Sequence, residues 1–137
     1  MSASEPLFVY GTLMFPEVLE VLLARTPAMA PANLGGGWRA AALTDRVYPG
    51  LVAAPAPRAV VGQLLLDLDD DEYEVLDAFE DVLYERRILP LTDGRPAMTY
   101  VWLDAALVLP HDWDPAAFVT DHMPTYVAHW SDWRRSL

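Results

Sequence analysis

The spacing of apolar residues along the chain predicts alternating strands and helices. Residues 7–13 (Leu-Phe-Val-Tyr-Gly-Thr-Leu) form an apolar run without polar alternation, which is typical of a strand buried on both faces. Gly11 can end this strand, because a residue without Cβ tolerates positive φ or a close neighbour. A proline at position 16 then favours a helix over 15–25. The strand end and the helix start together present free backbone N–H groups, which is a favourable place for a carboxylate or phosphate. The alternative is an ordinary buried strand with a tight turn.

The middle of the chain is predicted to form short strands around one acidic helix. We expect a loop over 27–37, strands over 38–43, 50–52, 60–68, 84–91 and 97–103, prolines ending a strand at 55–57, and a hairpin turn at 92–96. Asp69 and Glu72 have the spacing of a capping box, so a helix is predicted from there to about residue 79.

The last part of the chain has the pattern of two consecutive helices. Asp114 followed by Pro115 is typical of an N-cap with proline at the first helical position. Pro124 should break or kink this helix and leave a second short piece to about residue 134. The whole pattern predicts one α+β domain over residues 1–137, in which helices pack around a mixed sheet.

Composition and charge narrow the classes of protein that the chain can represent. Its 137 residues, 53% of them hydrophobic and 21% charged, can bury a core as one domain. The net charge of −11 argues against nucleic-acid and anionic membrane partners, and the absence of cysteine excludes disulfides and thiolate catalysis. No apolar run approaches the ~20 residues that span a bilayer, and residues 1–5 show no signal-peptide pattern, so we expect a cytoplasmic protein.

Glu80 is the strongest single candidate for acid–base chemistry. Tyr73, Leu76 and Glu80 are spaced by three and four, which puts a carboxylate on the apolar face of the acidic helix. Desolvation and the negative end of the helix macrodipole both disfavour the ionised form, so the pKa of Glu80 should rise toward neutrality. A general acid–base needs such a pKa. The alternative is a helix-end glutamate that turns into water.

Other reactive residues lack the spacing that their chemistry requires. His111, His122 and His129 do not have the i, i+4 spacing of a helical metal pair, so no metal site is expected. The acidic run over 69–72 lacks the alternating ligands and the glycine of a calcium loop. The serines lie near both ends of the chain without a G-x-S-x-G elbow, which argues against a serine hydrolase.

Four short motifs follow one another along the chain: Phe-Val-Tyr-Gly-Thr-Leu at 8–13, Tyr-Pro-Gly-Leu at 48–51, Leu-Asp-Ala-Phe-Glu at 76–80 and Tyr-Glu-Arg-Arg at 84–87. This set resembles the gamma-glutamylcyclotransferase-like family, and the resemblance extends from the first strand through residues 100–102. It implies a small mixed β-barrel with flanking helices. It also implies a cofactor-free reaction that converts a γ-glutamyl amine, the expected small-molecule partner, into 5-oxoproline and a free amine.

The resemblance further implies roles for individual residues. Glu80 would be the general acid–base, and the loop over 10–13 would hold the glutamyl group through backbone N–H groups. The implied substrate-binding residues are Tyr10, Gly11, Thr12, Leu13, Tyr48, Pro49 and Tyr84. The nucleophile would be the substrate's own amine, so neither a cofactor nor a metal is expected.

Two residues depart from the family pattern, and two others have alternative roles. Asp81 stands where glycine often follows the glutamate, and Gly50 replaces a bulkier residue in the turn expected to line the pocket. The charge of Asp81 would raise the pKa of Glu80 if both faced the pocket, although adjacent helical positions usually point apart. Arg86 should pair with an acid of the preceding helix rather than orient a carboxylate. Tyr84 either binds substrate or fills the core.

Two rival functions are also compatible with the sequence. A domain of the same fold could bind a small carboxylate without turning it over, as the departures at Gly50 and Asp81 suggest. The C-terminal segment is more apolar than a solvated tail should be, with Trp113, Phe118, Tyr126, Trp130 and Trp133. We expect this segment to cover the sheet, and a protein-interaction surface is the alternative.

Overall fold

A computed structural model of the chain describes residues 6–55 and 59–137. Its strands form a five-stranded and a three-stranded sheet. The larger sheet contains β1 (Leu7–Val9), β2 (Met29–Leu34), β5 (Val60–Leu65), β6 (Tyr84–Pro90) and β7 (Pro96–Trp102) in the order β2-β5-β1-β7-β6. The smaller sheet contains β3 (Trp38–Leu43), β4 (Gly50–Ala53) and β8 (Val108–Asp112) in the order β4-β3-β8.

The sheets are open, which corrects the expected β-barrel while confirming a mixed α+β fold. Strand β1 pairs antiparallel with β5 and parallel with β7, so the larger sheet is mixed. An isolated bridge between Leu34 and Leu91 joins its two edges at one point, but no ladder of strands closes it within the described residues. A barrel requires continuous pairing around the whole circumference, and this pairing stops at β2 and β6.

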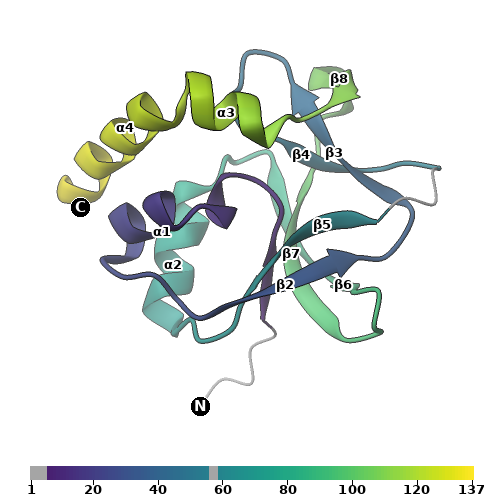
Figure 1. Cartoon of the computed structure of the whole chain (residues 1–137), viewed down its shortest axis with the longest axis horizontal. Coiled ribbons are helices and arrows are strands. Elements are labelled where there is room, and N and C mark those ends of the chain that lie inside the picture. Colours follow the sequence, from purple (N-terminus) through teal and green to yellow (C-terminus); the bar gives the residue numbers. More distant parts are fainter. Residues whose placement is uncertain (1–5, 56–58) are drawn as a thin grey trace.

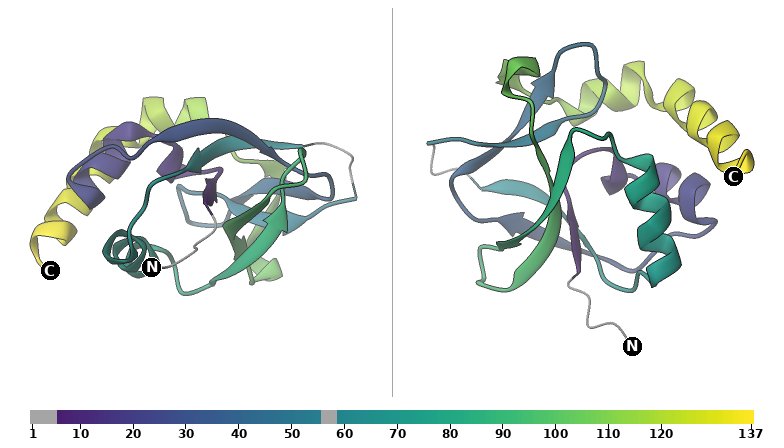
Figure 2. Two further views of the ribbon diagram at one scale, coloured as in Figure 1. Left: turned by 90° about the horizontal axis from the view of Figure 1, so that it is seen from below. Right: turned by 180° about the vertical axis from the view of Figure 1, so that it is seen from behind.

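Four helices accompany the sheets in the described part of the chain: α1 (Pro16–Leu23), α2 (Asp70–Phe79), α3 (Pro115–Asp121) and α4 (Met123–Arg135). Figures 1 and 2 show α1, α2 and α4 grouped on one side of the larger sheet, with α3 leading into α4. Short 3-10 helices lie at η1 (Thr12–Met14) and η2 (Ala105–Leu107). None of the described helices is both long enough and apolar enough to cross a membrane.

Strand β1 is buried on both faces, as its uninterrupted apolar sequence predicts. Leu7 and Val9 belong to the core cluster that the helices cover, whereas Phe8 and Tyr10 belong to a second cluster between the sheets. The strand therefore lies at the centre of the molecule. The loop that follows Tyr10 therefore starts from a strand that is packed on both faces.

Three predicted elements differ from the structure. The loop expected over 27–37 contains strand β2, and the segment that forms strand β8 was not expected to be a strand. Both strands contain a proline and lie at the edge of a sheet. At an edge, the missing N–H of proline costs no hydrogen bond between strands. The chain breaks at His122 rather than at Pro124, which occupies the first turn of α4, so the last helix has 13 residues instead of being short. The strand end expected at 55–57 falls partly outside the described residues.

Candidate active site

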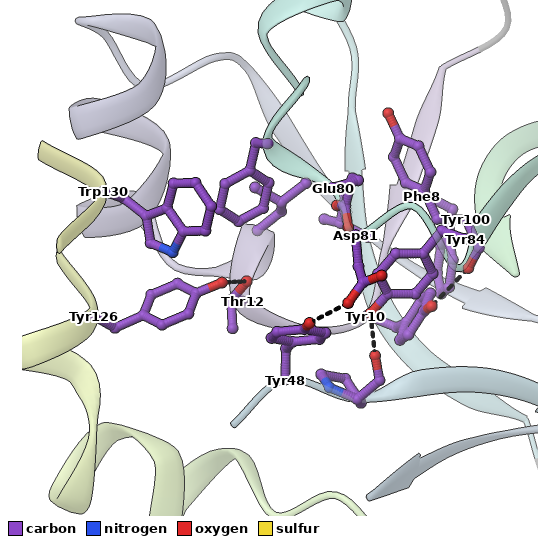
Figure 3. A pocket seen from close by; sticks show the side chains of 15 residues that line it. Phe8, Tyr10, Thr12, Tyr48, Glu80, Asp81, Tyr84, Tyr100, Tyr126 and Trp130 are labelled. Atoms are coloured by element: carbon purple, nitrogen blue, oxygen red, sulfur yellow. Dashed lines mark hydrogen bonds between the residues drawn. The ribbon is translucent and has the colours of Figure 1, made fainter. Parts of the chain in front are cut away.

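A cavity of about 240 Å³ lies where β1, α2, α4 and the segment before β4 meet (Figure 3). All eight residues implied by the motifs line it: Tyr10, Gly11, Thr12, Leu13, Tyr48, Pro49, Glu80 and Tyr84. The remaining lining residues are Phe8, Val9, Phe79, Asp81, Tyr100, Tyr126 and Trp130. The structure thus brings together segments that are far apart in the sequence.

One wall of the cavity is the loop where β1 ends and η1 begins. The Met14 N–H donates to the Gly11 carbonyl at 3.0 Å. Met14 is the first residue whose N–H donates within η1, so the N–H groups of Gly11, Thr12 and Leu13 take no part in the hydrogen bonds of this 3-10 helix. Gly11 has a φ of −124°, which other residues also adopt. Glycine is needed here because Pro49 packs against the backbone: a Cβ at position 11 would lie 2.8 Å from Pro49 Cδ.

Glu80 comes directly after α2 and lines the cavity. Its N–H donates to the Leu76 carbonyl at 3.0 Å, which keeps it in helical phase, while its ψ of 146° ends the helix. Within residues 6–55 and 59–137 the Glu80 carboxylate forms neither a hydrogen bond nor an ion pair. Burial, followed by the charges of Asp77 and Asp81, raises the pKa of Glu80 to about 8.

Asp81 lines the same cavity, which corrects the expectation that neighbouring positions point apart. Because α2 ends before both residues, helical geometry does not separate them. The Asp81 carboxylate accepts hydrogen bonds from the Tyr48 hydroxyl at 2.6 Å, the Leu83 N–H at 2.9 Å and Arg46 Nε at 3.3 Å. Burial alone would raise the pKa of Asp81, but these hydrogen bonds outweigh it and hold the pKa below its usual value.

Every tyrosine hydroxyl of the cavity is engaged within the protein. The pairs are Tyr10 with the Tyr100 carbonyl (2.6 Å) and the Leu51 N–H (3.0 Å), Tyr48 with Asp81, Tyr84 with the Pro49 carbonyl, Tyr100 with Asp77 (2.6 Å) and Tyr126 with Thr12 (3.0 Å). Burial, reinforced by Asp81, raises the pKa of Tyr48 to about 12. These phenols therefore stay neutral and hold the walls in place.

Other residues of the motifs serve packing rather than the cavity. Arg86 pairs with Asp77 at 3.4 Å, as expected for an arginine beside the acidic helix. Gly50 does not line the cavity, because it lies against β7, where a Cβ would be 2.7 Å from Trp102 Cβ. The turn before β4 forms the cavity wall through Tyr48 and Pro49 instead. No group of His, Asp and Glu side chains in the described ranges is arranged to hold a metal ion.

A family model described as "Gamma-glutamyl cyclotransferase, AIG2-like" matches residues 7–115. The chain belongs to this family. AIG2-like protein D of Arabidopsis thaliana is 43% identical over 101 residues, 69% of this chain and 65% of the relative. AIG2-like protein C of the same plant is 43% identical over 105 residues, 73% and 60% of the two chains.

The fold is likewise shared within this gamma-glutamyl cyclotransferase, AIG2-like family. A solution structure of an Arabidopsis thaliana protein superposes with a TM-score of 0.69 and 26% identity, covering 96% of this chain and 82% of the other. The chain spans less than two thirds of the length of the curated relatives AIG2-like protein D and AIG2-like protein C.

Two cavity residues, Tyr126 and Trp130, were not anticipated from the sequence as site residues. Both lie on α4, beyond the segment that the family model matches, and were expected only to cover the sheet. They do pack in the helix-side core, and the Phe79 and Trp130 rings lie 4.5 Å apart. The available signal was their spacing of four, which places two aromatic rings on one helical face.

Proposed function

We propose that this protein converts γ-glutamyl amines, or γ-glutamyl amino compounds, into 5-oxoproline and the free amine, with Glu80 as general acid–base. The observation that carries the proposal is the Glu80 carboxylate, which has no partner in the described residues, a raised pKa and a place in the cavity. The family membership supports the type of reaction.

The proposed reaction consists of two proton transfers through Glu80 around one ring closure, followed by loss of one further proton from the ring nitrogen. The Glu80 carboxylate takes a proton from the α-ammonium of the substrate, and the freed amine nitrogen attacks the γ-carbonyl carbon. The resulting tetrahedral intermediate breaks its original bond to the leaving nitrogen, and Glu80 returns the proton to that nitrogen. The ring nitrogen, which entered as an ammonium, then gives up its remaining extra proton to the amine product or to solvent. The products are 5-oxoproline and an amine, and no water molecule enters the balance.

The raised pKa of Glu80 suits both proton transfers. A glutamate of ordinary pKa, about 4.3, is a weak base toward an ammonium, because each unit of mismatch corresponds to about 1.36 kcal/mol. A pKa of about 8 removes much of that mismatch. We assign the N–H groups of Gly11, Thr12 and Leu13 to the substrate carboxylate or to the oxyanion of the intermediate, because the loop presents them at the same cavity.

The test measures release of 5-oxoproline from a panel of γ-glutamyl amines and γ-glutamyl amino acids. The wild type should turn over at least one member, and Glu80→Gln should lower kcat by about 10²–10⁴. Because Glu80 must be ionised to accept the first proton, kcat/KM should rise with pH up to about 8. Glu74→Gln, an exposed change on the same helix, is the matched control and should leave the rate unchanged.

Full activity of Glu80→Gln would overturn the proposed mechanism. Thermal stabilisation by 5-oxoproline or glutamate, without turnover of any panel member, would instead favour a domain that binds small carboxylates. The second candidate rests on Asp81, an acid at the position where the resemblance implies glycine.

A further inference from the structure

The cavity offers a ligand few polar groups apart from Glu80 and the loop N–H groups. The hydroxyls of its five tyrosines are engaged with protein atoms. The Asp81 carboxylate accepts three hydrogen bonds from the protein. A ligand group that accepts hydrogen bonds away from Glu80 and the loop would therefore lose its water without gaining a donor, and one that donates would meet only oxygens that already take part in hydrogen bonds.

One end of the cavity is formed by three aromatic side chains, Phe79, Tyr126 and Trp130, which we call the aromatic wall. In the view of Figure 3, Tyr126 and Trp130 lie at one end of the lining residues, and Tyr10 and Tyr84 lie toward the other.

The rings of the aromatic wall pack against one another. Their centroids are 4.5 Å apart for Phe79 and Trp130, 6.1 Å for Tyr126 and Trp130, and 6.4 Å for Phe79 and Tyr126, with interplanar angles of 60–87°. Rings in edge-to-face contact form a continuous apolar surface.

We propose that the aromatic wall receives the amine part of the substrate and selects amines with an apolar, aromatic or branched aliphatic group. This inference rests on the proposed function, in which the loop over 10–13 and Glu80 hold the glutamyl part. With those polar groups occupied by the glutamyl part, the departing amine meets the aromatic wall. An apolar amine gains by leaving water there, whereas a second charge on the amine would be desolvated against three rings that carry no opposite charge.

Two of the three rings of the aromatic wall belong to the C-terminal helix. Tyr126 and Trp130 lie on α4, outside residues 7–115 that the family model matches. The helix is held in place by the bond between Tyr126 and Thr12 and by Arg134 Nε, which donates to the Leu22 carbonyl at 2.8 Å. A rigidly placed wall can discriminate between leaving groups.

The first experiment compares two substrates that share the glutamyl part and differ in the amine. We would measure 5-oxoproline release from γ-glutamyl-(3-methylbutyl)amide and γ-glutamyl-(4-aminobutyl)amide, with γ-glutamyl-methylamide as a minimal substrate. We expect kcat/KM to be at least about tenfold higher for the 3-methylbutyl compound, a typical discrimination in an apolar pocket. Equal values, or a preference for the aminobutyl compound, would overturn the inference.

The second experiment removes one ring of the wall. Trp130→Ala should bring the two values of kcat/KM within about twofold of each other. Trp133→Ala is the matched control: its ring lies 5.1 Å from that of Trp130 on the same helix but does not line the cavity, so the preference should persist. A preference that survives Trp130→Ala would also contradict the proposal.

The two levels of proposal fail in distinguishable ways. If no γ-glutamyl compound released 5-oxoproline, the proposed function itself would fall, and this inference with it. If all three compounds were turned over at similar kcat/KM, the function would stand and only the role of the aromatic wall would be wrong. The comparison in the wild type decides this even if Trp130→Ala does not fold.

Discussion

The two ends of α2 hold carboxylates in opposite electrostatic situations. At the N-terminal end, the Asp69 carboxylate accepts from the Glu72 N–H at 2.8 Å, and the Glu72 carboxylate accepts from the Asp69 N–H at 3.1 Å. The Glu72 carboxylate also accepts two hydrogen bonds of 2.7 Å from Arg25. At the C-terminal end, Glu80 has no comparable partner within the described residues, and Asp81 brings a second negative charge. The helix macrodipole adds to both effects, because it favours negative charge only at the N-terminus.

The difference separates a structural carboxylate from one available for chemistry. The hydrogen bond from Arg25 is the main cause that lowers the pKa of Glu72, whereas burial is the main cause that raises the pKa of Glu80 to about 8. A paired carboxylate stabilises the fold at neutral pH, and a buried carboxylate without a partner destabilises it. Retaining the second kind is expected where function requires it.

The largest expected effect is a gain of stability from Glu80→Gln. The pKa of Glu80 is raised in the folded state, so its stabilising contribution is complete below about pH 4.5 and is lost as the pH rises to about 8. Glutamine has no charge to bury, so the free energy of unfolding should exceed that of the wild type by about 2 kcal/mol at pH 8, after allowance for partial exposure. Urea unfolding at pH 4 and pH 8 measures this difference. A gain that is equal at both pH values would show that burial of charge is not its cause.

The opposite sign is expected for Glu72→Gln at the other end of the helix. Loss of the charged partner of Arg25 and of part of the capping box should lower the free energy of unfolding by about 1 kcal/mol at pH 7. Because the pKa of Glu72 is lowered in the folded state, its contribution is present above the unfolded value of 4.5 and disappears as the pH falls through the folded pKa. Urea unfolding should therefore show a smaller loss at pH 3 than at pH 7, and the exposed change Glu74→Gln should show little loss at either.

Features of the fold that depend on neighbouring residues were predictable from the sequence. The capping box of α2, the N-cap at Asp114 and strand β3 occur where their local patterns place them. The two strands that were missed, β2 and β8, both contain a proline, which local propensity excludes from a strand and an edge position tolerates. Edge position depends on the pairing of distant segments, and so does the openness of the sheets.

The candidate site shows the same division between local and distant information. The helical spacing of Tyr73, Leu76 and Glu80 correctly places the carboxylate beside a buried face. The position of Asp81 depends on the residue at which α2 stops, which a periodic pattern gives only to within a turn. The contribution of Tyr126 depends on how α4 packs beside Thr12, 114 positions away along the chain, and no local pattern encodes that contact.

The smallest and most specific effect is expected from Asp81→Asn. Asp81 contributes a negative charge that raises the pKa of Glu80, and its carboxylate anchors Tyr48 at 2.6 Å. Asparagine removes the charge but still offers an oxygen to the Tyr48 hydroxyl. The rising limb of the kcat/KM profile should therefore move to lower pH by about half a unit, which corresponds to about 0.7 kcal/mol, while KM stays nearly constant.

Two comparisons separate the charge of Asp81 from its anchoring role. Asp81→Ala removes both the charge and the bond to Tyr48, so it should shift the profile and also raise KM. Asp77→Asn removes the larger of the two charges acting on Glu80 and should shift the profile further than Asp81→Asn does. If Asp81→Asn left the profile unmoved while Asp81→Ala raised KM, Asp81 would be an anchor for the cavity wall alone. The raised pKa of Glu80 would then come from burial and Asp77, and the acid at position 81 would not alter the proposed acid–base chemistry.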